Sequence, residues 1–227
     1  LLGVSSLVAN GIAETITFHH AESEVHWAVI TAFSIAVFVA YDFGRYIGHW
    51  VQHKNAFLWE FHKVHHSAEV LTPLTSFRLH PVDLLLMSVT PGIFTGLVGG
   101  VAILATGGAV TPWQFLGMHA GVAGYHLISN LRHTHVWISF GPRISRFLIS
   151  PAQHQIHHSA SEEHFHKNIG WAFAVWDRWF GTLYVPHGRE DIVYGLGDGT
   201  DADYHGVVKM YFLPVVRALM SFMAKNN

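Results

Sequence analysis

The chain has 227 residues, of which half are hydrophobic and only 12% carry a charge, about half of the charged share of an ordinary soluble domain. A lipid bilayer, which needs no charged surface facing it, is the simplest explanation. The net charge of −2 argues against a nucleic-acid-binding protein. The absence of cysteine excludes disulfides, thiolate zinc sites and iron–sulfur clusters. The 20 histidines are unusual, and imidazole is the commonest metal ligand among side chains.

Apolar stretches follow one another along the chain. Residues 1–13 are apolar and predict the end of a membrane or interfacial helix, and because the chain begins at Leu1 and not at Met we expect a truncated product. A helix needs about 20 apolar residues to cross the hydrocarbon core. Three further apolar stretches follow, and glycine and proline between the second and the third of them predict a tight hairpin. Residues 207–224 are amphipathic and predict an interfacial helix. The predicted membrane helices are residues 27–47, 84–106 and 110–130.

Basic residues orient these helices. All 13 Lys and Arg residues lie either between Arg45 and Arg78 or from Arg132 onward. The positive-inside rule places both regions in the cytoplasm. We therefore predict an all-α, multi-pass integral membrane protein with about four membrane or interfacial helices and a cytosolic helical cap. A helical hairpin buried in a soluble core is the alternative, but the chain lacks long amphipathic helices to cover it. The chain is predicted to be one domain, 1–227, with the cap at 48–80 and 131–205.

Histidines cluster at helical spacing within the predicted cap. Side chains three and four positions apart share one helix face, whereas adjacent side chains diverge by about 100° around the axis. Two His-x-x-His-His units can therefore each serve two neighbouring ions. A looser set, in which His119, His126, Asn130 and His133 follow at intervals of seven, four and three, predicts one more helical stripe. The dense clusters are His49 with His53, His62 with His65 and His66, and His154 with His157 and His158.

A lone histidine is more often a hydrogen-bonded structural residue than a ligand. Eight histidines at these spacings on one membrane face are different, because their mutual repulsion when protonated would be costly without a metal. Imidazole suits zinc, copper, iron and nickel. A structural zinc site is complete with four ligands, so eight or more histidines imply two ions. Asp42 precedes His49 by one face repeat and is interpreted as an acceptor that orients a ligand ring.

The ordered set of motifs resembles the fatty acid hydroxylase/sterol desaturase superfamily of membrane di-iron enzymes, from about residue 41 to 214. One departure is His133-Thr134-His135, where the family commonly has His-x-Asn. Another is His166, near a position where relatives often carry an acid; His164 and His166 are predicted to be exposed. The motifs are Asp42 with His49-x-x-x-His53, residues 58–67 (LWEFHKVHHS), 78–81 (RLHP), 151–159 (PAQHQIHHS), 168–170 (NIG) and 176–184 (WDRWFGTLY).

The resemblance implies a helical membrane stem, two iron ions held by three histidine boxes, and electrons from a separate reductase with a cytochrome or ferredoxin. Trp176-Asp177-Arg178 is more simply interpreted as a packing and salt-bridge motif. The predicted metal ligands are His49, His53, His62, His65, His66, His126, His133, His154, His157 and His158. The candidate outer ligands or orienting residues are Asp42, His80, Asn130, His135 and Asp177. The histidines interpreted as ordinary interfacial or loop residues are His19, His20, His26, His187 and His205.

These features predict O₂-dependent hydroxylation, or desaturation, of an unactivated C–H bond in a membrane lipid that enters from the bilayer. Sterol, fatty acyl chain, sphingoid base, ether lipid and carotenoid all stay open as substrates. Two other classes of protein remain as alternatives. One is a zinc-dependent membrane hydrolase that activates water. The other is a non-catalytic metal-binding accessory subunit of a membrane complex.

Overall fold

The computed structural model describes residues 1–15 and 25–225, so His19 and His20 lie outside the described residues. The described part of the chain is helical and contains no strand beyond two isolated bridges, which confirms the all-α prediction. The α-helices are α1 Leu2–Ala13, α2 Trp27–Lys54, α3 Ala56–His66, α4 Pro81–Ala105, α5 Pro112–Met118, α6 Ala120–Ser129, α7 Gly141–Ile144, α8 Pro151–His157, α9 Val175–Phe180 and α10 Val207–Lys225. Four 3₁₀ helices join them: η1 Pro73–Phe77, η2 Asn130–Arg132, η3 Glu162–His164 and η4 Asp201–Tyr204.

Three helices of the described chain are long and apolar enough to cross a membrane: α2, α4 and α10. The first two match predicted membrane helices, although α2 continues to Lys54, about two turns beyond the predicted end. The third predicted span is interrupted, because α5 ends at Met118 and α6 begins at Ala120. Glycines flank the break, and each costs a helix about 1 kcal/mol relative to alanine. The predicted stripe from His119 to His133 is not one continuous helix either, because α6 ends at Ser129 and η2 follows it.

The chain forms two compact units. The first contains the described residues of Leu1–Ile47 and Met87–Ser129, and the second contains those of Gly48–Leu86 and of the chain from Asn130 onward. Two of the three boundaries fall within long helices, α2 and α4, and the third lies between α6 and η2. The second unit includes both segments of the predicted cap.

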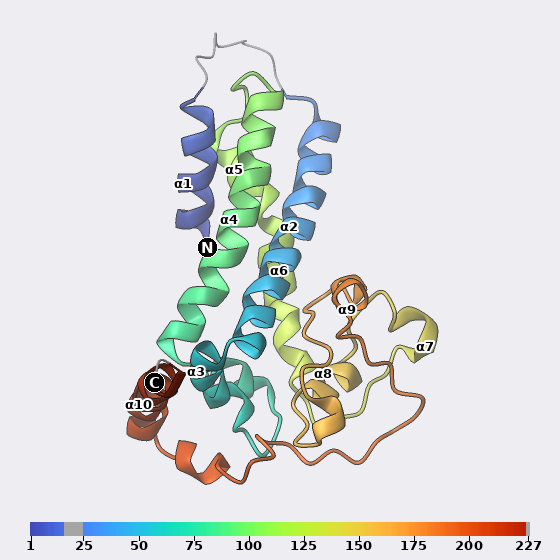
Figure 1. Ribbon diagram of the computed structural model, residues 1–227. Helices are drawn as coiled ribbons and strands as arrows, with labels where there is room; N and C mark the ends of the chain where they lie inside the picture. Colours follow the sequence, from blue (N-terminus) through green and yellow to red (C-terminus); the bar gives the residue numbers. More distant parts are fainter. Residues whose placement is uncertain (16–24, 226–227) are drawn as a thin grey trace. The chain divides into compact units, whose positions relative to one another are not determined.

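Small residues let the helices of the first unit pack closely, as the neighbouring ribbons of α1, α2, α4 and α5 in Figure 1 illustrate. A Cβ atom at Gly92 would lie 2.7 Å from Val4 Cβ of α1, and one at Gly96 would lie 2.6 Å from Val8 Cβ. A Cβ atom at Gly44 of α2 would lie 2.5 Å from the Pro91 Cα of α4. Such close backbone approach is typical of helix packing in membranes.

The Gly44 contact predicts an unusually large effect for a single methyl group. In Gly44→Ala the new methyl meets Pro91 backbone, which cannot rotate away, so we expect a loss of about 1–3 kcal/mol in unfolding free energy. The matched control is Gly124→Ala in α6, where a Cβ atom has nothing within 4 Å. That substitution should be neutral or stabilising. Unfolding in detergent followed by circular dichroism measures both, and equal midpoints for the two variants would contradict the close α2–α4 packing.

In the second unit, short capped helices carry the histidine motifs. Helix α3 begins after Asn55, whose side chain accepts from the Leu58 backbone N–H. Helix α8 begins after Ser150, which forms a capping box with Gln153. Helix α10 packs on α3, and Val64, Leu196 and Tyr204 form the core beneath α3. These contacts hold α3, which carries one His-x-x-His-His unit, while the capping box starts α8, which carries the other as far as His157.

Candidate metal centre

The second unit brings nine of the ten predicted ligands into two groups of imidazoles. Within each group the candidate ligand nitrogens all lie within 4.8 Å of one another. Eight of the nine side chains are at most 6% exposed, and His49 is half-buried. The first group is His49, His53, His62, His66 and His157, and the second group is His65, His133, His154 and His158.

Each His-x-x-His-His unit divides between the two groups, as its spacing predicts. In α3, the side chains four apart, His62 and His66, belong to the first group, whereas His65 belongs to the second. In the other unit, His154 and His158 belong to the second group and His157 to the first. Adjacent histidines therefore face different groups on both segments. The two groups are also neighbours, since the rings of His66 and His158 stack with centroids 4.5 Å apart.

Oxygen acceptors fix the tautomers of three rings in the first group. An oxygen accepts a hydrogen bond, so each ring nitrogen that contacts one carries the proton, and the opposite nitrogen of the neutral ring presents a lone pair. This arrangement is typical of metal-bound histidine, whose second nitrogen is held by a carboxylate or a backbone carbonyl. The donors and acceptors are His49 Nδ1 to Ile169 O at 2.7 Å, His62 Nδ1 to Asp83 Oδ2 at 3.0 Å, and His157 Nδ1 to Lys167 O at 2.8 Å.

The lone pairs of those three rings converge. His49 Nε2 lies 2.9 Å from His62 Nε2 and 3.1 Å from His157 Nε2, and His53 Nε2 is 3.1 Å away from it as well. With Nδ1 protonated, His49, His62 and His157 cannot donate to one another, so a bare cluster would place lone pairs against each other. Two nitrogens that bind one metal at about 2.1 Å and at right angles are roughly 3 Å apart. The residues of the first group therefore fit a metal ion.

The second group shows the same separation of nitrogens. His133 Nε2 lies 3.2 Å from His65 Nε2 and 2.8 Å from His154 Nε2. Ser76 Oγ lies 2.8 Å from the other nitrogen of His133. Both ring nitrogens of His158 are buried without a hydrogen-bond partner among the described residues. An unsatisfied buried polar atom costs about 1–3 kcal/mol, and a metal ion bound to one of these nitrogens removes the cost for that atom.

Burial keeps these imidazoles in the state that binds metals. It lowers the pKa of His65 to about 3. It also lowers the pKa values of His66, His154 and His158 well below the usual range, and the neighbouring imidazoles lower them further. These rings are therefore neutral at pH 7, as metal coordination requires.

Asp177 organises the loop that orients His49. Its carboxylate is completely buried and accepts from the backbone N–H groups of Ile169 and Gly170, each at 2.8 Å, and from Thr182 Oγ1 at 2.5 Å. The Ile169 carbonyl in turn accepts from His49 Nδ1. A Cβ atom at residue 170 would lie 2.5 Å from Asp177 Oδ2, which explains the glycine of the Asn-Ile-Gly motif. Asp177 therefore acts on the first group through the backbone.

Several residues that the sequence predicts as metal ligands or orienting residues belong to neither histidine group. His126 lies in the first unit, where it hydrogen-bonds to Tyr41, and Asp42 is buried in that unit as well. His80 accepts from the Val82 N–H at Nδ1 and contacts the Tyr211 carbonyl at Nε2, so both of its nitrogens are engaged.

Other residues near the histidine boxes are exposed or act through the backbone. His135 is exposed, and Asn130 accepts the His133 N–H through its backbone carbonyl. His166 is exposed, as predicted, but the same prediction for His164 is wrong. His164 is 3% exposed because its ring packs on Tyr184 and lies 3.2 Å from a Glu190 oxygen.

Sequence reasoning did not identify Asp83, Ser76 or the two carbonyls that hold the rings. Asp83 was visible as an acidic residue after the Arg-Leu-His-Pro motif, and it is completely buried against His62. Ser76 lies in η1, with no local pattern that links it to His133. The carbonyl acceptors carry no side-chain signal at all.

The fold and the site together define a helical protein with helices of membrane-spanning length and a buried double histidine centre. Residues 34–182 match the sequence model of the fatty acid hydroxylase family, and the chain belongs to that family. No solved structure gives a significant match.

Curated relatives of the chain are named as lipid-oxidising enzymes. The chain is 25% identical over 79% of its length to ornithine lipid hydroxylase OlsE of Rhizobium tropici, covering 50% of that protein. It is 28% identical over 71% of its length to alkylglycerol monooxygenase of Homo sapiens, covering 32% of it. It is 28% identical over 75% of its length to Delta(7)-sterol 5(6)-desaturase ERG3B of Gibberella zeae, covering 47% of it. The chain thus spans half or less of these relatives.

Proposed function

We propose that the chain is an O₂-dependent lipid hydroxylase of the membrane, with two iron ions in the two histidine groups. The observation that supports this most is the set of nine converging imidazoles divided between adjacent groups, with no carboxylate in either group. Imidazole suits redox-active iron. Nine ligands exceed what one structural zinc ion uses. The apolar helices agree with a substrate drawn from the bilayer.

The reaction consumes one O₂, two electrons and two protons, and it converts a C–H bond into C–OH with release of water. The iron pair supplies O₂ binding and oxidising power. The imidazoles of this chain hold the ions, and Asp83 with the Ile169 and Lys167 carbonyls fixes the rings. Electrons come from a separate reductase with a cytochrome or ferredoxin. The positive-inside rule favours a multi-pass protein with its metal centre on the cytoplasmic side.

The test is lipid profiling of cells that express the intact chain or the His157→Ala variant, grown under ¹⁸O₂. We expect a lipid whose mass increases by one ¹⁸O atom with the intact chain and not with the variant. Mössbauer spectroscopy of the purified ⁵⁷Fe-labelled protein should show two coupled irons. Unchanged lipids would instead favour an accessory subunit. Zinc in both groups, with a product that carries oxygen from water, would favour a hydrolase.

A further inference from the structure

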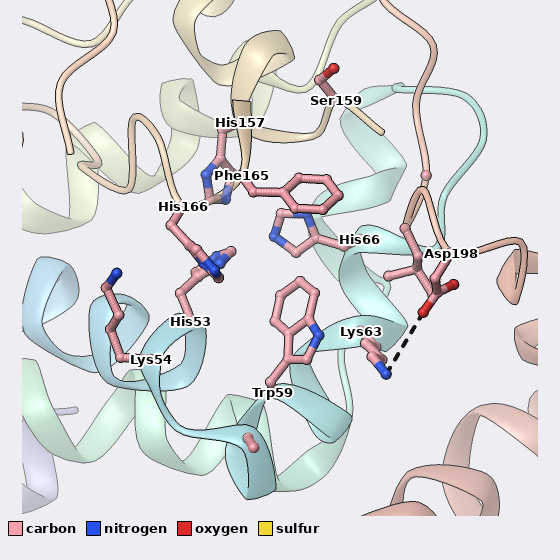
Figure 2. A pocket seen from close by; sticks show the side chains of 13 residues that line it. His53, Lys54, Trp59, Lys63, His66, His157, Ser159, Phe165, His166 and Asp198 are labelled. Atoms are coloured by element: carbon pink, nitrogen blue, oxygen red, sulfur yellow. Dashed lines mark ion pairs between the residues drawn. The ribbon is translucent and has the colours of Figure 1, made fainter. Parts of the chain in front are cut away.

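A cavity of about 370 Å³ lies beside the first group, within the usual size range of small-ligand sites. Figure 2 shows the side chains of His53, His66 and His157 at its inner side, facing the enclosed space. All of the lining residues belong to the second unit. A ligand in this cavity therefore lies directly against the proposed metal ligands.

Part of the cavity wall is apolar and aromatic. The Trp59 ring lies 5.0 Å from the His53 ring and 5.3 Å from the His66 ring, measured between centroids. Phe165 and Leu196 extend this wall. Such a surface favours apolar groups, because covering it removes apolar area from water. It suits the hydrocarbon part of a lipid.

The charges at the cavity are unbalanced. Lys54 and Lys63 are the permanently charged cations among the lining residues. Lys63 is neutralised by Glu60 at 2.9 Å and by Asp198 at 4.0 Å. Lys54 is exposed, and no acidic group of the described residues lies within ion-pair distance of it. Figure 2 shows its amine on the same side of the cavity as His166.

We propose that this cavity binds a lipid that carries an anionic group, which pairs with Lys54 while the adjoining hydrocarbon lies along Trp59 and Phe165. This assignment rests on the proposed function and narrows its substrate class to acidic lipids. Lys54 and His53 both line the cavity, so an anion on the Lys54 amine holds the adjoining hydrocarbon beside the first group. A neutral lipid of equal length contacts the same apolar wall but offers no anionic group to the Lys54 amine.

Binding of cis-parinaric acid and of its methyl ester to the purified, metal-loaded full chain tests the proposal. Both probes have the same polyene chain, and only the acid carries a charge. At constant detergent concentration, we expect the intact protein to prefer the acid. Lys54→Gln should weaken binding of the acid about three- to tenfold and leave the ester unchanged, since a charge-assisted contact contributes about 0.5–1.5 kcal/mol at a partly exposed site. Lys54→Arg should restore the preference.

The matched control is Lys209→Gln, which removes one exposed positive charge of α10 that does not line the cavity. It should bind both probes like the intact protein. Equal affinity for acid and ester, or an equal loss in the Lys54 and Lys209 variants, would overturn the proposal. The assay needs no turnover. A Lys54-dependent preference for the acid in a protein without oxygenase activity would therefore reject the proposed function and retain the binding site. Oxygenase activity without a Lys54-dependent preference would retain the proposed function and reject the binding site.

Discussion

Replacing His157 or His158 by alanine is expected to remove different metal ions, although the two residues are neighbours in the chain. His157 belongs to the first group and His158 to the second. Each variant should therefore retain about one of the two ions proposed for the intact protein. Both should lose the proposed oxygenase activity by two orders of magnitude or more, because losing even a residue that only orients a ligand costs 10–100-fold. Metal analysis per protein chain and product formation measure the two effects.

His187→Ala is the control, because His187 is exposed and belongs to neither group. It should retain both ions and full activity. The spectra add a sharper distinction: the single iron left in each variant should lose magnetic coupling, and the two variants should differ in their Mössbauer parameters. If both variants lost the same ion, the division of the His-x-x-His-His units between two groups would be wrong.

Local periodicity was sufficient to predict how the histidines divide. On a helix, positions i and i+4 share a face and position i+3 diverges from its neighbour, so the separation of His65 from His66 follows from backbone geometry alone. The apolar stretches likewise predicted α2 and α4, because a run of about 20 apolar residues has few stable conformations other than a spanning helix. These features depend on residues close together in the chain.

Features that depend on distant residues were not accessible in this way. His126 has the correct spacing from His133, but the helix is interrupted between them, and its ring meets Tyr41, which is 85 positions away. Asp83 reaches His62 over 21 positions, and the Ile169 carbonyl reaches His49 over 120. A backbone acceptor can belong to any residue type, so no sequence pattern identifies it.

Asp177 illustrates the same limit and gives the second large prediction. The Trp-Asp-Arg motif is compatible with a packing and salt-bridge motif, and no sequence pattern shows that the Asp177 carboxylate accepts from two backbone N–H groups and a hydroxyl. In Asp177→Ala these donors lose their acceptor. We expect a loss of about 3–5 kcal/mol in unfolding free energy, since each unsatisfied buried group costs about 1–3 kcal/mol. Thermal and denaturant unfolding in detergent measure this loss.

Asp177→Asn separates the effect on stability from the effect on the metal centre. Asparagine keeps one acceptor oxygen and nearly the same volume, so the protein should fold while the Ile169–Gly170 backbone shifts. Because the Ile169 carbonyl fixes His49 Nδ1, metal affinity of the first group should fall about 10–100-fold, and that of the second group should not change. The control is Asp203→Asn, whose partly exposed pair with Arg217 should contribute under about 1 kcal/mol. If Asp177→Asn loses stability but binds both metal ions like the intact protein, then Asp177 only supports the fold, and the backbone link from Asp177 to His49 has no role in metal binding.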